Sequence, residues 1–419
     1  MVWLVLLILM LMIFFGMPIG FALMITAAIA MLLSGIDLIM APIQMFSGVN
    51  KVVLLAIPLF IFMGELMGAT SISDRIINLA RALVGWMRGG LAHVNVVTSM
   101  FMAEMSGSAV ADAAVMSKIF VPSMEKQGYP RSFAAAVTAT SATLGIIIPP
   151  SIPMVLYGVT TNTSIKDLFV AGIIPGLILG GAFMITSYIF ARKEGHPVDA
   201  QFELPRLGRA FKAALVPLLI PVLVVGGLIG GFVTPTEAAT LGVVAALIYG
   251  WPIRRDLDFR RVYGLASATV RQTSVVMMII AGSAVLGQYL ANEQIPQKIA
   301  SGLGGLTDSF ILRMLLINIF LLLLGMFLHA SAAIIVVVPM LLPLSREMGI
   351  DPVHFGVIVC LNLGIGQQTP PVASVLLTVC SATGLKIEQV MGYCKWFILA
   401  MFVTLMIVSF TPLTALALL

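Results

Sequence analysis

The sequence TATSATLGIIIPPS at 138–151 places polar residues and a Pro-Pro pair inside an apolar segment. The stretch NLGIGQQTPPV at 362–372 repeats this design in the second half of the chain. A proline inside a helix removes one amide donor and leaves carbonyl groups unpaired. Each Pro-Pro pair therefore predicts a break within a membrane-spanning segment, the first over 131–163 and the second over 353–382.

The composition indicates a membrane protein. Of 419 residues, 60% are hydrophobic and 10% are charged, and the mean hydropathy is +1.10. Soluble domains carry about 25% charged residues, so the composition excludes a soluble enzyme, a nucleic-acid-binding protein and a disordered chain. At about 20 residues per spanning helix, the chain has room for roughly a dozen membrane segments. We therefore expect an all-α polytopic protein surrounded by the lipid bilayer.

Two basic clusters predict which side faces the cytoplasm. One lies in the polar stretch 192–212, which is predicted as a long loop, and the other lies at 254–261. Two apolar runs separate them, so both clusters are expected on one side, and basic loops favour the cytoplasm. The pattern over 72–88 predicts an amphipathic helix along the membrane surface, although an ordinary connecting helix fits equally well. The first apolar run, 1–34, is expected to be retained and to break at Gly16–Pro18.

An internal repeat relates the two halves of the chain. PSMEKQGYPRSF at 122–133 matches PLSREMGIDPVHF at 343–355, and the same shift along the sequence brings Pro149-Pro150 onto Pro370-Pro371. Each unit is predicted to contain a helical hairpin, a broken span and a further span. Counting the spans between the units predicts that the repeats are inverted, as in many secondary transporters. The expected organisation is N-terminal scaffold spans with an amphipathic arm (1–88), a first repeat (89–191, hairpin 90–124), a cytoplasmic loop with scaffold spans and a second arm (192–309), and a second repeat with the last span (310–419, hairpin 310–346).

The hairpins are predicted to be re-entrant. The first tip contains SGSAVAD at 106–112, which is small and polar within an otherwise apolar run. Irregular backbone at membrane depth must be buried in protein or line a cavity, because unsatisfied groups are costly in lipid. Two ordinary spanning helices would give the same topology, so both alternatives stay open. Freed carbonyls with Ser or Thr hydroxyls suit a small hard cation, and half-helix N-termini suit an anionic group.

Single residues in these segments have competing explanations. The polar runs before the Pro-Pro pairs favour contact with an ion or substrate over helix packing through small residues. Asp112 is expected either to assist ion binding or to cap locally, and His329 is expected to make a structural hydrogen bond rather than to relay protons. TPTE at 234–237 predicts a capping box that starts a helix. The sequence contains no Walker-type phosphate loop, which argues against ATP hydrolysis, and the chain is not expected to be an enzyme.

Seven stretches match a known family, and together they extend over essentially the full length. They are IPLFIFMGELMG (57–68), RALVGWMRGGLAHVNV (81–96), SGSAVADAA (106–114), IIPPSIPMVLYG (147–158), TPTEAA (234–239), GIDPVHFG (349–356) and TPPV (369–372). On these motifs the chain resembles the large membrane subunit of tripartite ATP-independent periplasmic (TRAP) transporters. The resemblance implies sodium-driven import of a small organic acid, such as a C4-dicarboxylate or sialic acid, by an elevator-type fold. It also implies a periplasmic substrate-binding protein, a separate small four-helix membrane subunit, and a multi-pass location in a bacterial or archaeal inner membrane.

The resemblance carries the family's sites onto the two hairpin tips and the two breaks. Sodium is the only metal expected, with no other cofactor and no nucleic-acid partner. The predicted ion-binding residues are Ser106, Gly107, Ser108, Thr140, Ser141, Thr143, Gly145, Gly325, Ser331, Asn362, Gly364, Gly366 and Thr369. The predicted substrate-binding residues are Ser108, Pro149, Pro150, Ser151, Pro370 and Pro371.

One departure from the family pattern and one alternative function remain. The second break, GIGQQTPPVAS at 364–374, departs from the family, in which apolar residues and a glycine after the Pro pair are more usual. The main alternative function is an ion-coupled anion carrier that works alone, without a binding protein. A membrane scaffold or enzyme subunit would not explain an inverted repeat with paired broken spans.

Overall fold

The computed structural model describes residues 2–106, 108–295, 298, 307 and 309–419, and the regular structure within them is helical. The first half contains α1 (Val2–Phe14), α2 (Ile19–Leu33), α3 (Met40–Val49), η1 (Val52–Leu55), α4 (Ala56–Gly68), α5 (Ile72–Val84), α6 (Gly90–Ser106), α7 (Ala109–Lys126), α8 (Arg131–Ala142), η2 (Thr143–Ile146), α9 (Ile152–Thr161) and α10 (Ile165–Glu194). The second half contains α11 (Leu204–Ile229), α12 (Pro235–Ile248), η3 (Tyr249–Ile253), α13 (Phe259–Asn292), α15 (Phe310–Phe327), α16 (Ala330–Glu347), α17 (Pro352–Gly366), α18 (Ser374–Thr383), α19 (Ile387–Phe410) and α20 (Leu413–Leu416).

Seven of the described helices are long and apolar enough to cross a membrane, or up to eight if the bent pair α3 and η1–α4 forms one span. The predicted all-α polytopic architecture is confirmed.

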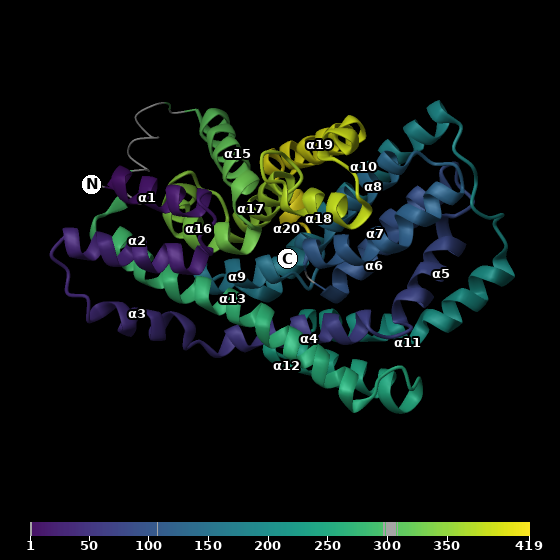
Figure 1. Ribbon diagram of the computed structural model, residues 1–419, viewed down its shortest axis with the longest axis horizontal. Coiled ribbons are helices and arrows are strands. Elements are labelled where there is room, and N and C mark those ends of the chain that lie inside the picture. The colour runs from purple at the N-terminus through teal and green to yellow at the C-terminus, as the bar shows by residue number, and fades with distance from the viewer. Residues whose placement is uncertain (1, 107, 296–297, 299–306, 308) are drawn as a thin grey trace.

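The N-terminal and central helices pack together along one side of the molecule. α13 contacts α2, α3 and α4, while α12 packs on α4, and α11 packs on α5 and α12 (Figure 1). The predicted break in the first apolar run is confirmed, because α1 and α2 are separated at Gly16, which has φ +83°. The predicted capping box at the start of α12 is also confirmed. Thr234 N donates to Glu237 Oε2 (2.7 Å), and Glu237 N donates to Thr234 Oγ1 (3.4 Å).

Helices α6–α10 and α15–α19 follow one pattern. Each set has two helices that meet at a tip, a helix that breaks before a second half-helix, and then a continuous helix. The Pro149-Pro150 and Pro370-Pro371 peptide bonds lie in the two breaks and are both cis. The sets interlock, since α7 of the first packs against α18 of the second and α16 of the second packs against α9 of the first (Figure 1). Neither set is therefore a separate packing unit.

Two boundaries predicted from the sequence are wrong. The amphipathic helix predicted over 72–88 ends at Val84. The polar loop predicted over 192–212 is largely helical, because α10 and α11 extend into it and leave only 195–203 as the connection. Lys and Arg are good helix formers, so a basic cluster can mark a membrane boundary without marking the end of a helix.

The connection after α10 pairs with the connection between α5 and α6. Gly89 N donates to Pro197 O (3.1 Å), and Asp199 N donates to Gly85 O (3.0 Å). Gly89 has φ +76°, a conformation that glycine adopts without strain. The paired segments, called the strap below, comprise residues 85–90 and 197–200. The strap fastens two connections that lie far apart in the sequence.

Acidic side chains fasten α5 at both of its ends. Asp199, whose side chain is 5% exposed, forms an ion pair with Arg81 of α5 (Nε to Oδ2, 2.9 Å) and accepts from Gln127 Nε2 (2.6 Å). At the other end, Ser71 N donates to Asp256 Oδ2 (2.9 Å). α5 is thereby joined to both basic segments that the sequence predicts on one side of the membrane.

Candidate functional site

A cavity of about 120 Å³ lies where the two hairpin tips meet. Ser108 and Ala109 line it from the tip between α6 and α7, and residues 329–331 line it from the tip between α15 and α16. Ile146 and Gln367 line it from the two breaks, and side chains of α4 and α13 complete the wall. The fold therefore brings together both predicted tips and both predicted breaks at one cavity.

Three helices begin at this central cavity, namely α7, α9 and α16, with N-caps Ser108, Ser151 and His329. The unpaired N–H groups of a helix N-terminus are equivalent to about half a positive charge. None of the described residues that line the cavity is Lys or Arg, so the helix ends supply the positive potential there. The His329 ring has no hydrogen-bond partner among the described residues, and the structural hydrogen bond expected for it is not found within them.

Unpaired oxygens lie at equivalent positions shortly before the two breaks. Ser141 and Asn362 stand equally far before Pro149 and Pro370, and Ser141 Oγ and Asn362 Oδ1 are buried with no hydrogen-bond partner among the described residues. Asn362 Nδ2 donates to Asn318 Oδ1 (2.8 Å), which fixes the amide. The hydroxyls of Thr140 and Thr143 donate to carbonyls of the preceding turn (2.8 and 2.5 Å). Oxygen lone pairs are the ligands that hard cations prefer, and each of these positions offers one such unpaired oxygen.

The predicted glycines and prolines of the second repeat have different surroundings. Gly325 and Gly366 are in backbone contact, since a Cβ added to Gly366 would lie 2.5 Å from Gly325 Cα. Close approach of α15 to α17 therefore accounts for both glycines. Gly364 has more room, because its added Cβ would meet no atom nearer than 3.5 Å. Pro370 and Pro371 are exposed and do not line the central cavity.

The remaining predicted site residues lie in several surroundings, and their roles stay predictions. Ser331 lines the central cavity, and Gly145 and Pro150 are buried in the first break. Thr369 donates to Ile365 O (2.9 Å), and Pro149 lines an apolar cleft of about 680 Å³ between α6, α10 and α11. The side chain of Ser106 and the whole of Gly107 lie outside the described residues.

α4 and α13 also line the central cavity, which the sequence pattern does not predict. Gln272 of α13 lines the central cavity and a neighbouring cavity of about 230 Å³, and its Nε2 donates to Glu65 Oε1 of α4 (2.8 Å). Asp112 is buried and lines the neighbouring cavity, not the central one. Gln368 Nε2 donates to Ala139 O (2.6 Å) and so links the two breaks directly. Polar residues within apolar helices were the available signal, but no sequence pattern shows what they face.

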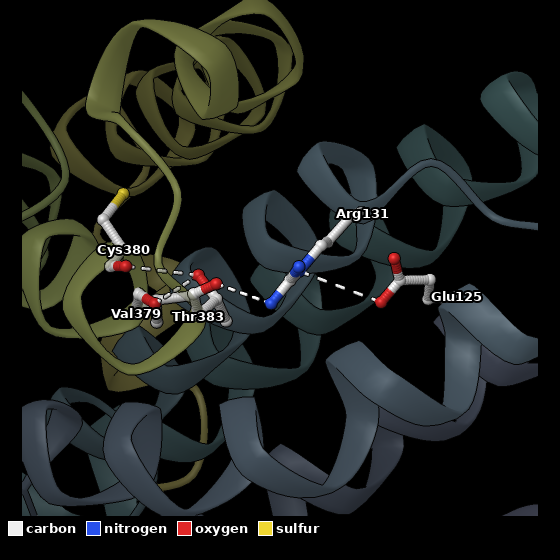
Figure 2. Close-up of polar contacts among 5 residues, drawn as sticks. All are labelled: Glu125, Arg131, Val379, Cys380 and Thr383. Atoms are coloured by element: carbon white, nitrogen blue, oxygen red, sulfur yellow. Dashed lines mark hydrogen bonds and ion pairs between the residues drawn. The ribbon is translucent and has the colours of Figure 1, made fainter.

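Each repeat is tied to the other at the end of a half-helix. Arg131 Nη2 at the start of α8 donates to Thr383 O at the end of α18 (2.7 Å), and Arg131 Nε lies 3.8 Å from Glu125 Oε2 (Figure 2). In the second repeat the position equivalent to Arg131 is Pro352, whose carbonyl accepts from Tyr157 Oη of α9 (2.7 Å). In both repeats, therefore, the first residue of the broken span bonds to the second half-helix of the other repeat: Arg131 of α8 to α18, and Pro352 of α17 to α9.

Replacing Arg131 by glutamine is expected to lower the free energy of unfolding by about 1 kcal/mol, because the bond to the last turn of α18 is charge-assisted but partly exposed. Thermal unfolding of the purified chain measures the effect. The control is Lys126→Gln, which removes an equal charge from the end of α7. Equal losses in the two variants would attribute the effect to net charge rather than to the tie.

The family of the chain follows from comparison with known proteins. Residues 6–414 match the family described as the tripartite ATP-independent periplasmic transporter, DctM component. This chain belongs to that family. The DctM-family assignment covers both repeats, the strap and the central cavity, and it confirms the resemblance seen in the motifs.

Named relatives of this DctM-family chain come from bacteria. It is 38% identical over 400 residues to the sialic acid TRAP transporter large permease protein SiaM of Vibrio cholerae, covering 95% of this chain and 94% of that one. It is 37% identical over 376 residues to the C4-dicarboxylate TRAP transporter large permease protein DctM of Pseudomonas aeruginosa, covering 90% and 88%. These relatives are permeases, so the chain is a multi-pass transport protein of the bacterial inner membrane and not an enzyme.

A solved structure shares the fold. The YdaH transporter of Alcanivorax borkumensis superimposes with a TM-score of 0.60 over 87% of this chain and 86% of that chain, at 16% sequence identity. At this level of identity the likeness concerns the fold alone. It agrees with the helical architecture described above.

Proposed function

We propose that this DctM-family chain imports a small organic acid together with sodium ions. The observation that carries the proposal is the central cavity, where three helix N-termini meet and no described lining residue is Lys or Arg. Such a cavity favours a carboxylate through N–H groups and helix dipoles. The relatives named for sialic acid and for C4-dicarboxylate support an organic acid as the substrate class.

Sodium is proposed as the coupling ion because of the unpaired oxygens in the breaks. Ser141 Oγ and Asn362 Oδ1 offer lone pairs at equivalent positions, and the carbonyls left without donors by the Pro-Pro pairs add further oxygen ligands. A cation beside the cavity would offset the charge of the acid. Binding of the two would then be mutually favourable, which is the requirement for symport.

The proposed motion is an elevator movement of the interlocked sets α6–α10 and α15–α19 against α4, α12 and α13. The reciprocal contacts of α7 with α18 and of α16 with α9 favour movement as one body. An inverted relation between the sets would supply two positions with similar internal packing. The proposed partners are a small four-helix membrane subunit and a periplasmic binding protein that delivers the acid, which accords with the tripartite family.

Uptake by proteoliposomes that contain the large subunit, the small subunit and the binding protein tests this function. Uptake of the acid that the binding protein retains is expected to need an inward sodium gradient and no ATP. Uptake that persists after collapse of the sodium gradient would contradict sodium coupling. Uptake that proceeds equally without the binding protein would support the stand-alone anion carrier instead.

Replacing Ser141 by alanine is expected to raise the sodium concentration for half-maximal uptake about tenfold, because a ligand to a charged group contributes about 1.5 kcal/mol. Sodium titration of uptake measures the shift. The control is Ser123→Ala on α7, where the hydroxyl only donates to Ile119 O (2.7 Å). An unchanged sodium dependence in Ser141→Ala would move the ion away from the first break.

A further inference from the structure

A turn rich in arginine joins two helices that are long and apolar enough to cross the membrane. Pro235–Ile253 and Phe259–Asn292 both have the length and composition of spans, so the turn between them lies at a membrane surface. Arg254, Arg255, Arg260 and Arg261 all fall within this short turn and the start of the second helix. Residues 254–261 are called the arginine hook below.

Both acidic groups of the hook accept hydrogen bonds from the protein. Asp256 Oδ2 accepts from both N and Oγ of Ser71 (2.9 and 2.7 Å). Burial alone would raise the pKa of Asp256, but these hydrogen bonds and the nearby Arg254 and Arg261 outweigh it and lower the pKa, so the carboxylate stays ionised. Asp258 Oδ1 accepts from Arg261 N (2.7 Å) and caps α13.

Two guanidinium groups of the hook stay available. Arg261 Nη1 donates to Asp256 O (2.9 Å), and Arg254 Nε donates to Ser71 Oγ (3.4 Å). Arg255 and Arg260 are exposed, have no partner among the described residues, and line one hollow of about 350 Å³. Asp256, Asp258 and Arg261 line the same hollow, so three guanidinium groups and two carboxylates meet there with a net positive charge. One oxygen of each carboxylate already accepts a hydrogen bond from the protein, whereas Arg255 and Arg260 have no hydrogen bond among the described residues.

Exposed aromatic side chains lie within and beside the hook. Trp251 is 42% exposed, Phe259 74% and Tyr263 71%. Trp and Tyr gather at membrane interfaces, where their rings lie at the level of the lipid headgroups. The hook therefore sets two free guanidiniums next to aromatic rings at headgroup depth.

We propose that Arg255 and Arg260 bind the phosphate headgroup of an anionic phospholipid in the leaflet that the hook faces, with Phe259 and Tyr263 against the glycerol and upper acyl chain. Guanidinium groups bind phosphate oxygens in a bidentate fashion. The hook is tied to the start of α5 through Asp256 and Ser71, so the bound lipid also steadies α5. The inference does not depend on sodium coupling or on the identity of the acid.

Native mass spectrometry of the purified full-length chain tests the proposal, with dioleoyl phosphatidylglycerol and dioleoyl phosphatidylcholine added separately. The wild-type chain is expected to retain phosphatidylglycerol, and the double variant Arg255→Gln/Arg260→Gln is expected to retain it about tenfold less. The control is Arg206→Gln/Arg209→Gln, which removes the same charge from the first turns of α11 and is expected to keep wild-type retention. Equal thermal unfolding of all three proteins in phosphatidylcholine verifies that the variants fold.

Three results would overturn the site. Equal loss of phosphatidylglycerol in both double variants would mean a diffuse basic surface. Equal retention of phosphatidylcholine and phosphatidylglycerol by the wild type would remove the charge requirement. Displacement of the lipid by millimolar inorganic phosphate would mean a site for free phosphate rather than for lipid.

Discussion

Replacing Gly366 by alanine is expected to abolish uptake and to lower the free energy of unfolding by about 3 kcal/mol, the upper range for overpacking. The added Cβ would lie 2.5 Å from Gly325 Cα and would also overlap the Gly325 carbonyl carbon. Both clashing atoms belong to the backbone of α15, which cannot rotate away as a side chain can. α15 and α17 would have to separate where the second tip meets the second break.

Gly364→Ala is the matched control, because it adds the same methyl group two residues earlier in the same helix. Its nearest neighbour would be Ile146 Cδ1 at 3.5 Å, an ordinary contact, so we expect near-normal uptake and stability. Thermal unfolding and proteoliposome uptake of both variants make the comparison. If Gly364→Ala were the more damaging change, the glycine at 364 would serve the ion or the substrate, and packing would not explain the pattern.

Replacing Asp199 by alanine is expected to lower the free energy of unfolding by about 2 kcal/mol and to reduce uptake several-fold, because removing one member of a partly buried pair costs more than the pair itself contributes. The change leaves Arg81 without its ion partner and Gln127 Nε2 without its acceptor, at a place where only 5% of the Asp199 side chain is exposed. The strap would loosen, so α5 would no longer hold the start of α6.

Glu203→Ala is the control for this change. It removes a carboxylate from the same connection, but Glu203 is exposed and its side chain caps no helix. Amide hydrogen exchange over 85–90 and 195–203 reports on the strap directly, and faster exchange in Asp199→Ala alone is expected. Unchanged exchange in that variant would mean that the backbone hydrogen bonds maintain the strap without the side chain.

Local signals explain what the sequence predicted well. A Pro-Pro pair removes amide donors wherever it occurs, and a Thr followed three residues later by Glu caps a helix by itself, as Thr234 does. The constant spacing between the repeated prolines located corresponding elements in the two halves. The membrane class followed from composition, since no long-range contact is needed to infer it.

Long-range contacts explain what the sequence could not predict. Gln368 donates to a carbonyl 229 residues away, and Gln272 lines the central cavity only because α13 lies against the hairpin tips. Gly366 resembles any glycine before a break until α15 is placed beside it. The predicted loop over 192–212 differs from the structure for a local reason, since the basic residues at the start of α11 favour helix.

The reciprocal ties between the repeats have a consequence for how this protein is made. The hydrogen-bond partner of Tyr157 is Pro352, which is synthesised 195 residues later, and that of Arg131 is Thr383, which is synthesised 252 residues later. At about 5–20 residues per second, a ribosome needs roughly 10–50 s to supply those segments. During that interval the first broken span is already synthesised, with carbonyls that lipid cannot satisfy. The nascent first repeat must therefore stay in a sheltered, hydrated place such as the insertion machinery until the second repeat arrives, and the finished cavity forms only after the last helices are delivered.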